Sequence, residues 1–111
     1  MSLRLVETGA FHERAAELLG DLETWALQMY LVQNPLAGKL ISGGHGLRKL
    51  RWASPGQGQG KRGGVRVIYY FQVGKTLYFV SVYPKSEKED LSALELRLLA
   101  REVEDFKNAQ G

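Results

Sequence analysis

The residues of this sequence best suited to chemistry are cations, and they gather in a long stretch without a carboxylate. From Thr24 to Ser86 there is no Asp or Glu, and all 12 acidic residues lie before or after this stretch. Its cations are Lys39, Arg48, Lys49, Arg51, Lys61, Arg62, Arg66, Lys75 and Lys85. Such a separation of charge predicts a surface that binds an anion, and a phosphate backbone is the obvious candidate. A solvated basic surface with no specific partner is the simpler alternative.

The missing carboxylates also limit the catalysis that this stretch can support. Without Asp or Glu it cannot supply the ligands that hold paired magnesium ions, so we expect neither a metal nor a cofactor. The chain has no cysteine, which excludes a thiolate metal site and a cysteine nucleophile. The two histidines, His12 and His45, remain an alternative acid–base pair, although surface histidines are ordinary in both places.

A cationic surface can still cleave RNA, because RNA carries its own nucleophile. The 2′-hydroxyl attacks the adjacent phosphorus once its proton is removed, and fixed arginines stabilise the charge that develops. Arginine stays protonated, whereas neighbouring cations lower the pKa of a lysine. Lys49, between Arg48 and Arg51, is therefore the first candidate for proton transfer, and Lys61 beside Arg62 is the second. The cations expected to bind the RNA backbone around the reacting groups are Lys39, Arg48, Lys61 and Arg62.

Arg66 is a second unusual cation, because it lies inside the apolar strand predicted for Val65–Val73. A cation there must reach solvent or an anion. It could pair with a distant glutamate, or it could clamp a phosphate beside Lys49 and Arg51 on the neighbouring strand. Ring faces for base stacking could come from Tyr69, Tyr70, Tyr78 and Tyr83. Most of these tyrosines are expected in the core, and Tyr83, at a strand end, is the best stacking candidate.

The elements that must position these residues follow from periodicity and from cap and turn residues. We expect the order strand, two helices, three strands and one helix. Thr8 should cap the first helix and Asp21 the second, which should carry Leu22, Trp25, Ala26 and Met29 on one face and end at Asn34-Pro35. The last helix should start at the capping box Ser92–Glu95 and run to about Lys107. The predicted strands are Leu3–Val6, Leu47–Trp52, Val65–Val73 and Thr76–Tyr83, with a mobile loop at Ala53–Gly64.

Length and hydropathy indicate one soluble domain over residues 1–111. The longest apolar runs, Val67–Phe71 and Leu77–Val80, are strand-sized and too short to span a bilayer, so we expect no membrane contact. The start of the chain is polar and lacks an apolar signal core, and cytoplasmic localisation is expected.

Three runs of residues together resemble the RelE/HigB-type toxins of bacterial type II toxin–antitoxin systems, in particular the HigB-like branch. They are Gly46–Trp52, Gly60–Tyr70 and Tyr83–Ser92. The resemblance implies an α+β fold in the order β-α-α-β-β-β-α, with a mainly antiparallel four-stranded sheet, a helical hairpin and a C-terminal helix. It implies a ribosome-dependent endoribonuclease that cleaves mRNA in the A site without a metal and leaves a cyclic phosphate. It also implies a cognate antitoxin, which often carries a helix-turn-helix DNA-binding domain.

The resemblance also implies roles for single residues. The two alternating cations on the strand after the helical hairpin are Lys49 and Arg51, the arginine on the next strand is Arg66, and the cation after the last strand is Lys85. Toxins of the RelE type have a tyrosine soon after that cation, which this sequence lacks, so Tyr83 is the expected substitute. Two other functions fit the same fold: a ParE-like toxin that inhibits DNA gyrase, and a non-catalytic RNA-binding relative.

Overall fold

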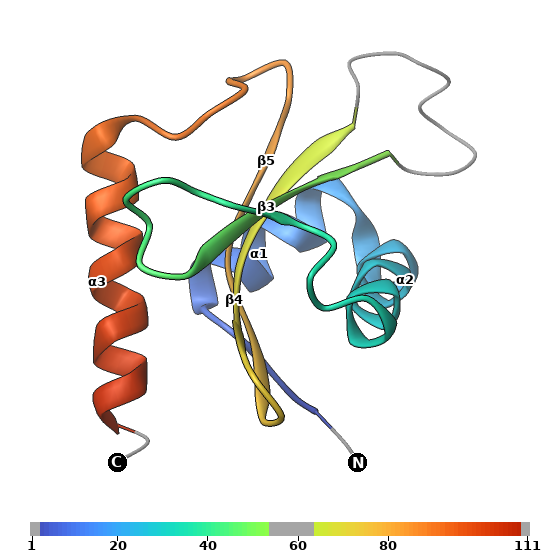
Figure 1. Cartoon of the computed structure of the whole chain (residues 1–111). Coiled ribbons are helices and arrows are strands. Elements are labelled where there is room, and N and C mark those ends of the chain that lie inside the picture. The colour runs from blue at the N-terminus through green and yellow to red at the C-terminus, as the bar shows by residue number, and fades with distance from the viewer. Residues whose placement is uncertain (1–2, 54–63, 110–111) are drawn as a thin grey trace.

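The computed structural model describes residues 3–53 and 64–109 (Figure 1). The loop predicted at Ala53–Gly64 therefore lies almost wholly outside the described residues, and with it Lys61 and Arg62. The elements follow the predicted order, with one short strand added. They are β1 (Arg4–Glu7), α1 (Gly9–Leu18), α2 (Gly20–Gln33), β2 (Lys39–Leu40), β3 (Leu47–Trp52), β4 (Val65–Gln72), β5 (Thr76–Pro84) and α3 (Ala93–Ala109).

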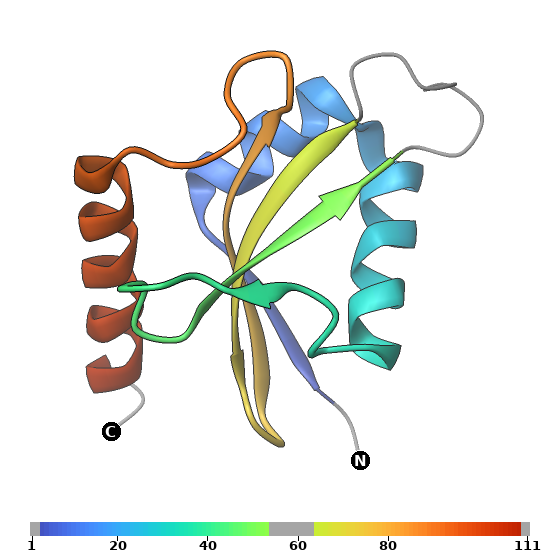
Figure 2. The same ribbon diagram turned by 45° about the horizontal axis from the view of Figure 1, so that its top comes forward.

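The strands form one five-stranded sheet in the order β1-β5-β4-β3-β2 (Figures 1 and 2). β1 is parallel to β5, and the other pairs are antiparallel. The α+β class and the mainly antiparallel sheet are thus confirmed, but the expected strand number of four is wrong. The additional strand β2 pairs Lys39 with Lys49 and Leu40 with Arg48 at the edge of the sheet. Two residues are too few for strand periodicity to reveal them in a sequence.

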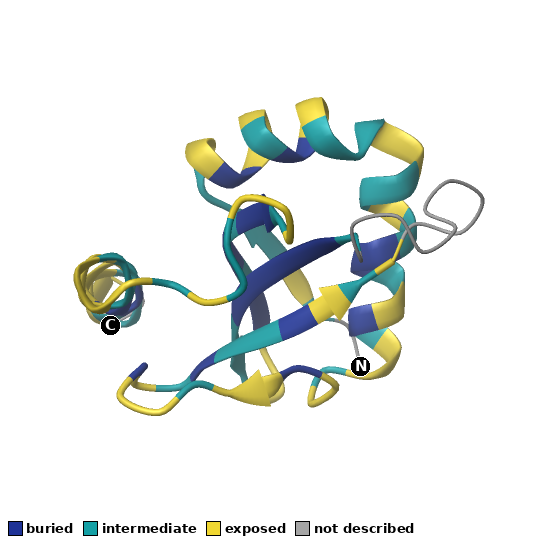
Figure 3. Ribbon diagram, turned by 90° about the horizontal axis from the view of Figure 1, so that it is seen from above, coloured by how far each residue is buried: buried dark blue, intermediate teal, exposed yellow. Residues whose placement is uncertain are grey.

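Apolar side chains cover both faces of the sheet, which lies between two helical layers (Figure 3). On one face, Phe11 and Leu27 from α1 and α2 pack with Tyr69 and Phe79 of the sheet. On the other face, the α3 residues Ala100 and Val103 join the second cluster, whose strand members are Leu47, Ile68, Val80 and Tyr83. On the face of β3 that is turned toward α3, Leu47 is the apolar residue. Because side chains alternate along a strand, the next two residues on that face are Lys49 and Arg51.

The helical hairpin is present, but the predicted cap of α2 is wrong, and the apolar face identified in the sequence is not the buried side of this helix. α2 begins at Gly20, after Leu19, which provides no side-chain cap, so Asp21 lies in the first turn instead of capping it. The buried side of α2 carries Leu27, Gln28 and Leu31, whereas Leu22 is 80% exposed and Trp25 60% exposed. Apolar residues surround α2 on several sides, so periodicity alone could not identify its inner face. Thr8 caps α1 as predicted, by accepting a hydrogen bond from the amide of Phe11.

α3 starts at the predicted capping box. The Ser92 hydroxyl accepts a hydrogen bond from the amide of Glu95, and the Glu95 carboxylate accepts one from the amide of Ser92. Because this cap fixes the first turn of α3, it also fixes the end of the segment that connects β5 to α3, residues 85–92. In the described part of the chain, no helix is both long and apolar enough to cross a membrane.

Candidate functional site

Three neighbouring strands place basic and aromatic side chains side by side on the sheet face that α3 covers in part. Arg51 of β3 pairs with Arg66 of β4, which pairs with Tyr83 of β5, so the three form one row across the sheet. Lys49 precedes Arg51 by two residues and shares its face, as the alternation predicted. The candidate catalytic cations Lys49, Arg51 and Arg66 are therefore brought together, and we call them the cation cluster.

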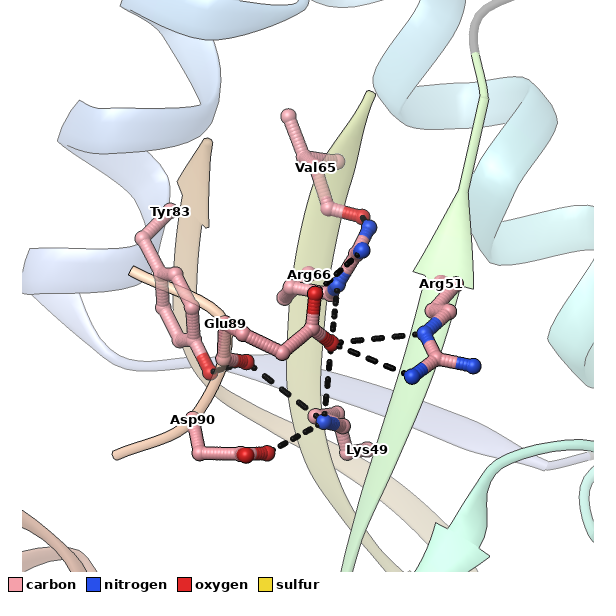
Figure 4. Close-up of polar contacts among 7 residues, drawn as sticks. All are labelled: Lys49, Arg51, Val65, Arg66, Tyr83, Glu89 and Asp90. Atoms are coloured by element: carbon pink, nitrogen blue, oxygen red, sulfur yellow. Dashed lines mark hydrogen bonds and ion pairs between the residues drawn. The ribbon is translucent and has the colours of Figure 1, made fainter. Parts of the chain in front are cut away.

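Two carboxylates from the β5–α3 connector enter this cluster (Figure 4). Glu89 Oε2 lies 2.9 Å from Arg66 Nε, 3.1 Å from Lys49 Nζ and 3.3 Å from both Arg51 Nε and Arg51 Nη2. Glu89 Oε1 lies 2.7 Å from Arg66 Nη2. Asp90 pairs with Lys49 Nζ from the solvent side. One carboxylate thus contacts all three members of the cation cluster.

Arg66 and Glu89 form the centre of this network. The Arg66 side chain is only 4% exposed and donates to both oxygens of Glu89, a bidentate geometry that suits a guanidinium. These hydrogen bonds, and then those from Lys49, hold the pKa of the Glu89 carboxyl well below its usual range. Of the two explanations offered for a cation in mid-strand, pairing with a distant glutamate is what the structure shows.

The prediction of a carboxylate-free surface is therefore wrong. The sequence gap from Thr24 to Ser86 is real, but Glu89 and Asp90 return to the site from beyond it because the connector folds over β4 and β3. Composition alone therefore does not define which carboxylates reach this surface. Within residues 3–53 and 64–109, no three His, Asp or Glu side chains lie together in an arrangement that could hold a metal ion.

Tyr83 belongs to the site as a buried residue. Its hydroxyl donates to the backbone carbonyl of Glu89 at 3.2 Å, and Lys88 Nζ lies 5.0 Å from the ring centroid. Burial, followed by the nearby carboxylates of Asp90 and Glu89, raises the pKa of Tyr83 to about 12. Its ring is enclosed by the core beneath α3, so the structure does not present it for stacking on a base, contrary to expectation.

The other predicted cations lie around the cluster or away from it. Lys39 is exposed on β2 and pairs in register with Lys49. Arg48 points to the opposite face, where its Nη1 donates to the carbonyl of Gly38 at 2.7 Å, so it is not the neighbour of the Lys49 ammonium that the sequence suggested. Lys85 is exposed just beyond β5, and its side chain has no hydrogen bond or ion pair with the described residues.

The two histidines do not meet at the cation cluster. His12 lies on α1 and its Nδ1 is 3.0 Å from Glu7 Oε1. His45 lies in the β2–β3 connector, where it lines a hollow with Arg97 and Arg101 of α3. Neither contacts the other, and the alternative acid–base pair receives no support from their placement.

Two hollows flank the ion pair between Lys49 and Asp90. One is lined by Lys39, Lys49, Tyr83 and Asp90 together with apolar side chains from the end of β2 and the residue after it, from β4, from the β5–α3 connector and from the first turn of α3, namely Leu40, Ile41, Ile68, Leu91 and Leu96. The other lies toward Ala37 and is lined by Lys39, Lys49, Arg51 and Asp90. Lys39 and Lys49 therefore border both concave surfaces.

The depressed pKa of Glu89 predicts how stability depends on pH. A carboxyl whose folded-state pKa lies below its ordinary value of 4.5 stabilises the fold above that pH, and the contribution is lost as the pH falls. We expect the melting temperature of the wild type to exceed that of Glu89→Gln near neutral pH. The difference should shrink as the pH falls from roughly 6 to roughly 3. Glu13→Gln, at an exposed glutamate of α1, controls for net charge, and a difference independent of pH would contradict the prediction.

A comparison with known protein families places these observations in context. The matching family is described as RelE toxin of the RelE/RelB toxin–antitoxin system, and the match covers residues 33–110. It thus includes β2 to β5, the connector and α3, and with them every residue of the cation cluster and both carboxylates. Since the match extends over more than half of the chain, the protein belongs to the RelE family of toxins from toxin–antitoxin systems.

Proposed function

We propose that this RelE-family toxin, of the HigB-like branch, is an endoribonuclease that cleaves mRNA in the ribosomal A site without a metal. The observation that carries this proposal is the convergence of Lys49, Arg51 and Arg66 on one small oxyanion. Three cations fixed by two neighbouring strands, β3 and β4, around one carboxylate make a surface that also suits the oxygens of a phosphodiester. The cytoplasm is the compartment in which such a toxin would meet its substrate.

The reaction we propose uses the RNA 2′-hydroxyl as nucleophile. Its oxygen forms a bond to the adjacent phosphorus while the bond from phosphorus to the 5′-oxygen breaks, which leaves a 2′,3′-cyclic phosphate and a 5′-hydroxyl. Lys49 is the group that takes the proton from the 2′-hydroxyl. Arg51 and Arg66 stabilise the negative charge on the phosphorus oxygens. Lys85 serves as a phosphate ligand or as the acid for the leaving group from its exposed position beyond β5.

The hollows beside Lys49 support this assignment, because a nucleotide needs room on either side of the phosphate. The hollow with Ile41, Ile68 and Leu91 offers apolar surface for a base, and Lys39 and Lys49 border it for the backbone. Lys61 and Arg62 are proposed to contact RNA as well.

We expect neutralisation by a cognate antitoxin, with a helix-turn-helix domain as the proposed partner type. Leu94 and Leu98 of α3 lie one helical turn apart, and both are exposed and outside the two core clusters. An exposed apolar pair on a helix at the rim of the site supports this face as a docking surface for the antitoxin.

Purified toxin added to translating ribosomes with end-labelled mRNA tests the activity. We expect cuts within translated codons, with 2′,3′-cyclic phosphate ends and no cut where the 2′-hydroxyl is replaced by hydrogen. Lys75→Ala, at an exposed cation in the β4–β5 turn, should cleave as the wild type does. RNA binding without cleavage would instead indicate a non-catalytic relative. In cells that express the toxin, an arrest of DNA replication that precedes the arrest of translation would indicate a gyrase inhibitor.

A further inference from the structure

The Glu89 carboxylate occupies the space between the three cations that an RNA phosphate would need. Its two oxygens take five contacts of 2.7–3.3 Å from Lys49, Arg51 and Arg66 (Figure 4). A phosphodiester also presents two oxygens that share one negative charge, so it would compete for the same donors. We infer that Glu89 is an internal ligand of the phosphate site, and that RNA binds to the cluster only after this carboxylate has moved out. The inference rests on the proposed function.

The burial of Arg66 makes the two anions mutually exclusive. Both of its donors that face the cluster, Nε and Nη2, are directed at Glu89, and its third nitrogen, Nη1, lies 3.4 Å from the carbonyl of Val65. With 4% of its side chain exposed, Arg66 offers no open side on which a second anion could bind. A phosphate can therefore reach Arg66 only through the position that Glu89 now holds.

The structure also shows how Glu89 can leave without unfolding of the connector. The backbone carbonyl of Glu89 accepts from the Tyr83 hydroxyl, and the connector is fixed at its far end by the Ser92 cap. The Glu89 side chain remains about one third exposed. Rotation about its side-chain bonds would carry the carboxylate into solvent while these backbone contacts persist. Displacement of Glu89 thus requires only the exchange of one set of ion pairs for another.

This competition selects for a class of substrate. A ligand that must displace Glu89 binds with an affinity reduced by the small fraction of molecules in which the site is open. An isolated phosphate or a short free RNA forms few contacts besides the ion pairs that it replaces, so its net binding free energy is small. A longer RNA chain held at additional points, as mRNA is on a ribosome, supplies the binding energy for displacement. Glu89 would therefore suppress action on free RNA.

Binding of an uncleavable RNA tests this inference independently of catalysis. The probe is a short RNA whose 2′-hydroxyls are all methylated, measured at constant ionic strength. Glu89→Gln keeps the shape of the side chain and removes its charge, and we expect it to bind the probe about tenfold more tightly than the wild type. Glu87→Gln is the matched control, because Glu87 lies in the same connector but pairs with Arg14 and Lys88. It should change the affinity much less.

Equal affinities for the two variants would overturn the inference. If Glu89→Gln does not fold, the wild type provides a second measurement. The carboxyl carbon of Glu89, followed by nuclear magnetic resonance, should move to the shift of a solvent-exposed glutamate as the probe saturates the protein. A signal that stays in place at saturation would equally overturn the inference. Tighter binding by Glu89→Gln without cleavage on ribosomes by any variant would leave it standing and refute the proposed activity alone.

Discussion

Replacement of Arg66 by lysine is expected to lower the rate of RNA cleavage by about 100-fold or more, the usual cost of losing one preorganised donor to a developing oxyanion. Lysine keeps the positive charge but cannot offer the two parallel N–H groups that Arg66 directs at a single anion. The measurement is single-turnover cleavage of mRNA on ribosomes at saturating toxin, so that weaker binding does not enter the rate.

Two controls separate this catalytic effect from a loss of structure. Arg66 is buried and anchors the connector through Glu89, so Arg66→Ala should also lower the melting temperature, whereas Arg66→Lys should lower it less. Lys75→Met removes an exposed cation in the β4–β5 turn, outside the cation cluster, and should cleave normally. Normal cleavage by Arg66→Lys, with its fold verified, would assign Arg66 to the support of Glu89 and remove it from catalysis.

Features that depend on a few neighbouring residues were predictable from the sequence. The alternation in β3 placed Lys49 and Arg51 on one face, and the Ser92–Glu95 box marked the start of α3. Arg66 stood out because a cation inside an apolar strand must reach solvent or an anion, and the structure shows an anion. Each of these inferences uses the geometry of a single strand or helix end, which the local sequence determines.

The identity of that anion was not predictable, because it depends on the path of the connector. Glu89 is distant in sequence from Arg66 and Lys49. It contacts them because α3 packs on one face of the sheet, so the connector that leads to α3 passes over β4 and β3. The one signal in the sequence for this anion was the acidic pair Glu89-Asp90. It follows the cationic stretch closely, with only Glu87 as an earlier carboxylate. The exposure of Trp25 and the strand β2 were missed for a similar reason, since both depend on tertiary packing.

The entry of two carboxylates changes what the cation cluster implies. A cluster of three cations without acids would attract any polyanion, whereas Glu89 and Asp90 reduce its formal charge from +3 to +1 in the free protein. Such a site contributes less to long-range attraction and more to discrimination between anions that can and cannot replace a carboxylate. Basic composition therefore pointed to the cations that gather on the sheet, but it did not reveal that two carboxylates reduce their net charge.

Replacement of Lys49 by methionine is expected to slow cleavage by a factor of about 100 to 10,000, the range in which a positioned proton-transfer group contributes. Lys49→Arg decides what the group does. Arginine preserves the charge and can still pair with Glu89 and Asp90, but it cannot readily release a proton. If Lys49 transfers the proton, both variants should be nearly inactive in single-turnover cleavage while both still bind the uncleavable RNA.

Lys39 provides a control residue for this prediction. Lys39 is the register partner of Lys49 and borders the same hollows, but it lies on the edge strand and outside the cation cluster. Lys39→Met should therefore weaken RNA binding and leave the cleavage rate at saturation close to that of the wild type. If Lys49→Arg cleaved as fast as the wild type, the role of Lys49 would be electrostatic. The proton would then have to be removed by another group, and Asp90, in contact with the Lys49 ammonium, is the nearest carboxylate left for that role once Glu89 has yielded its position to the phosphate.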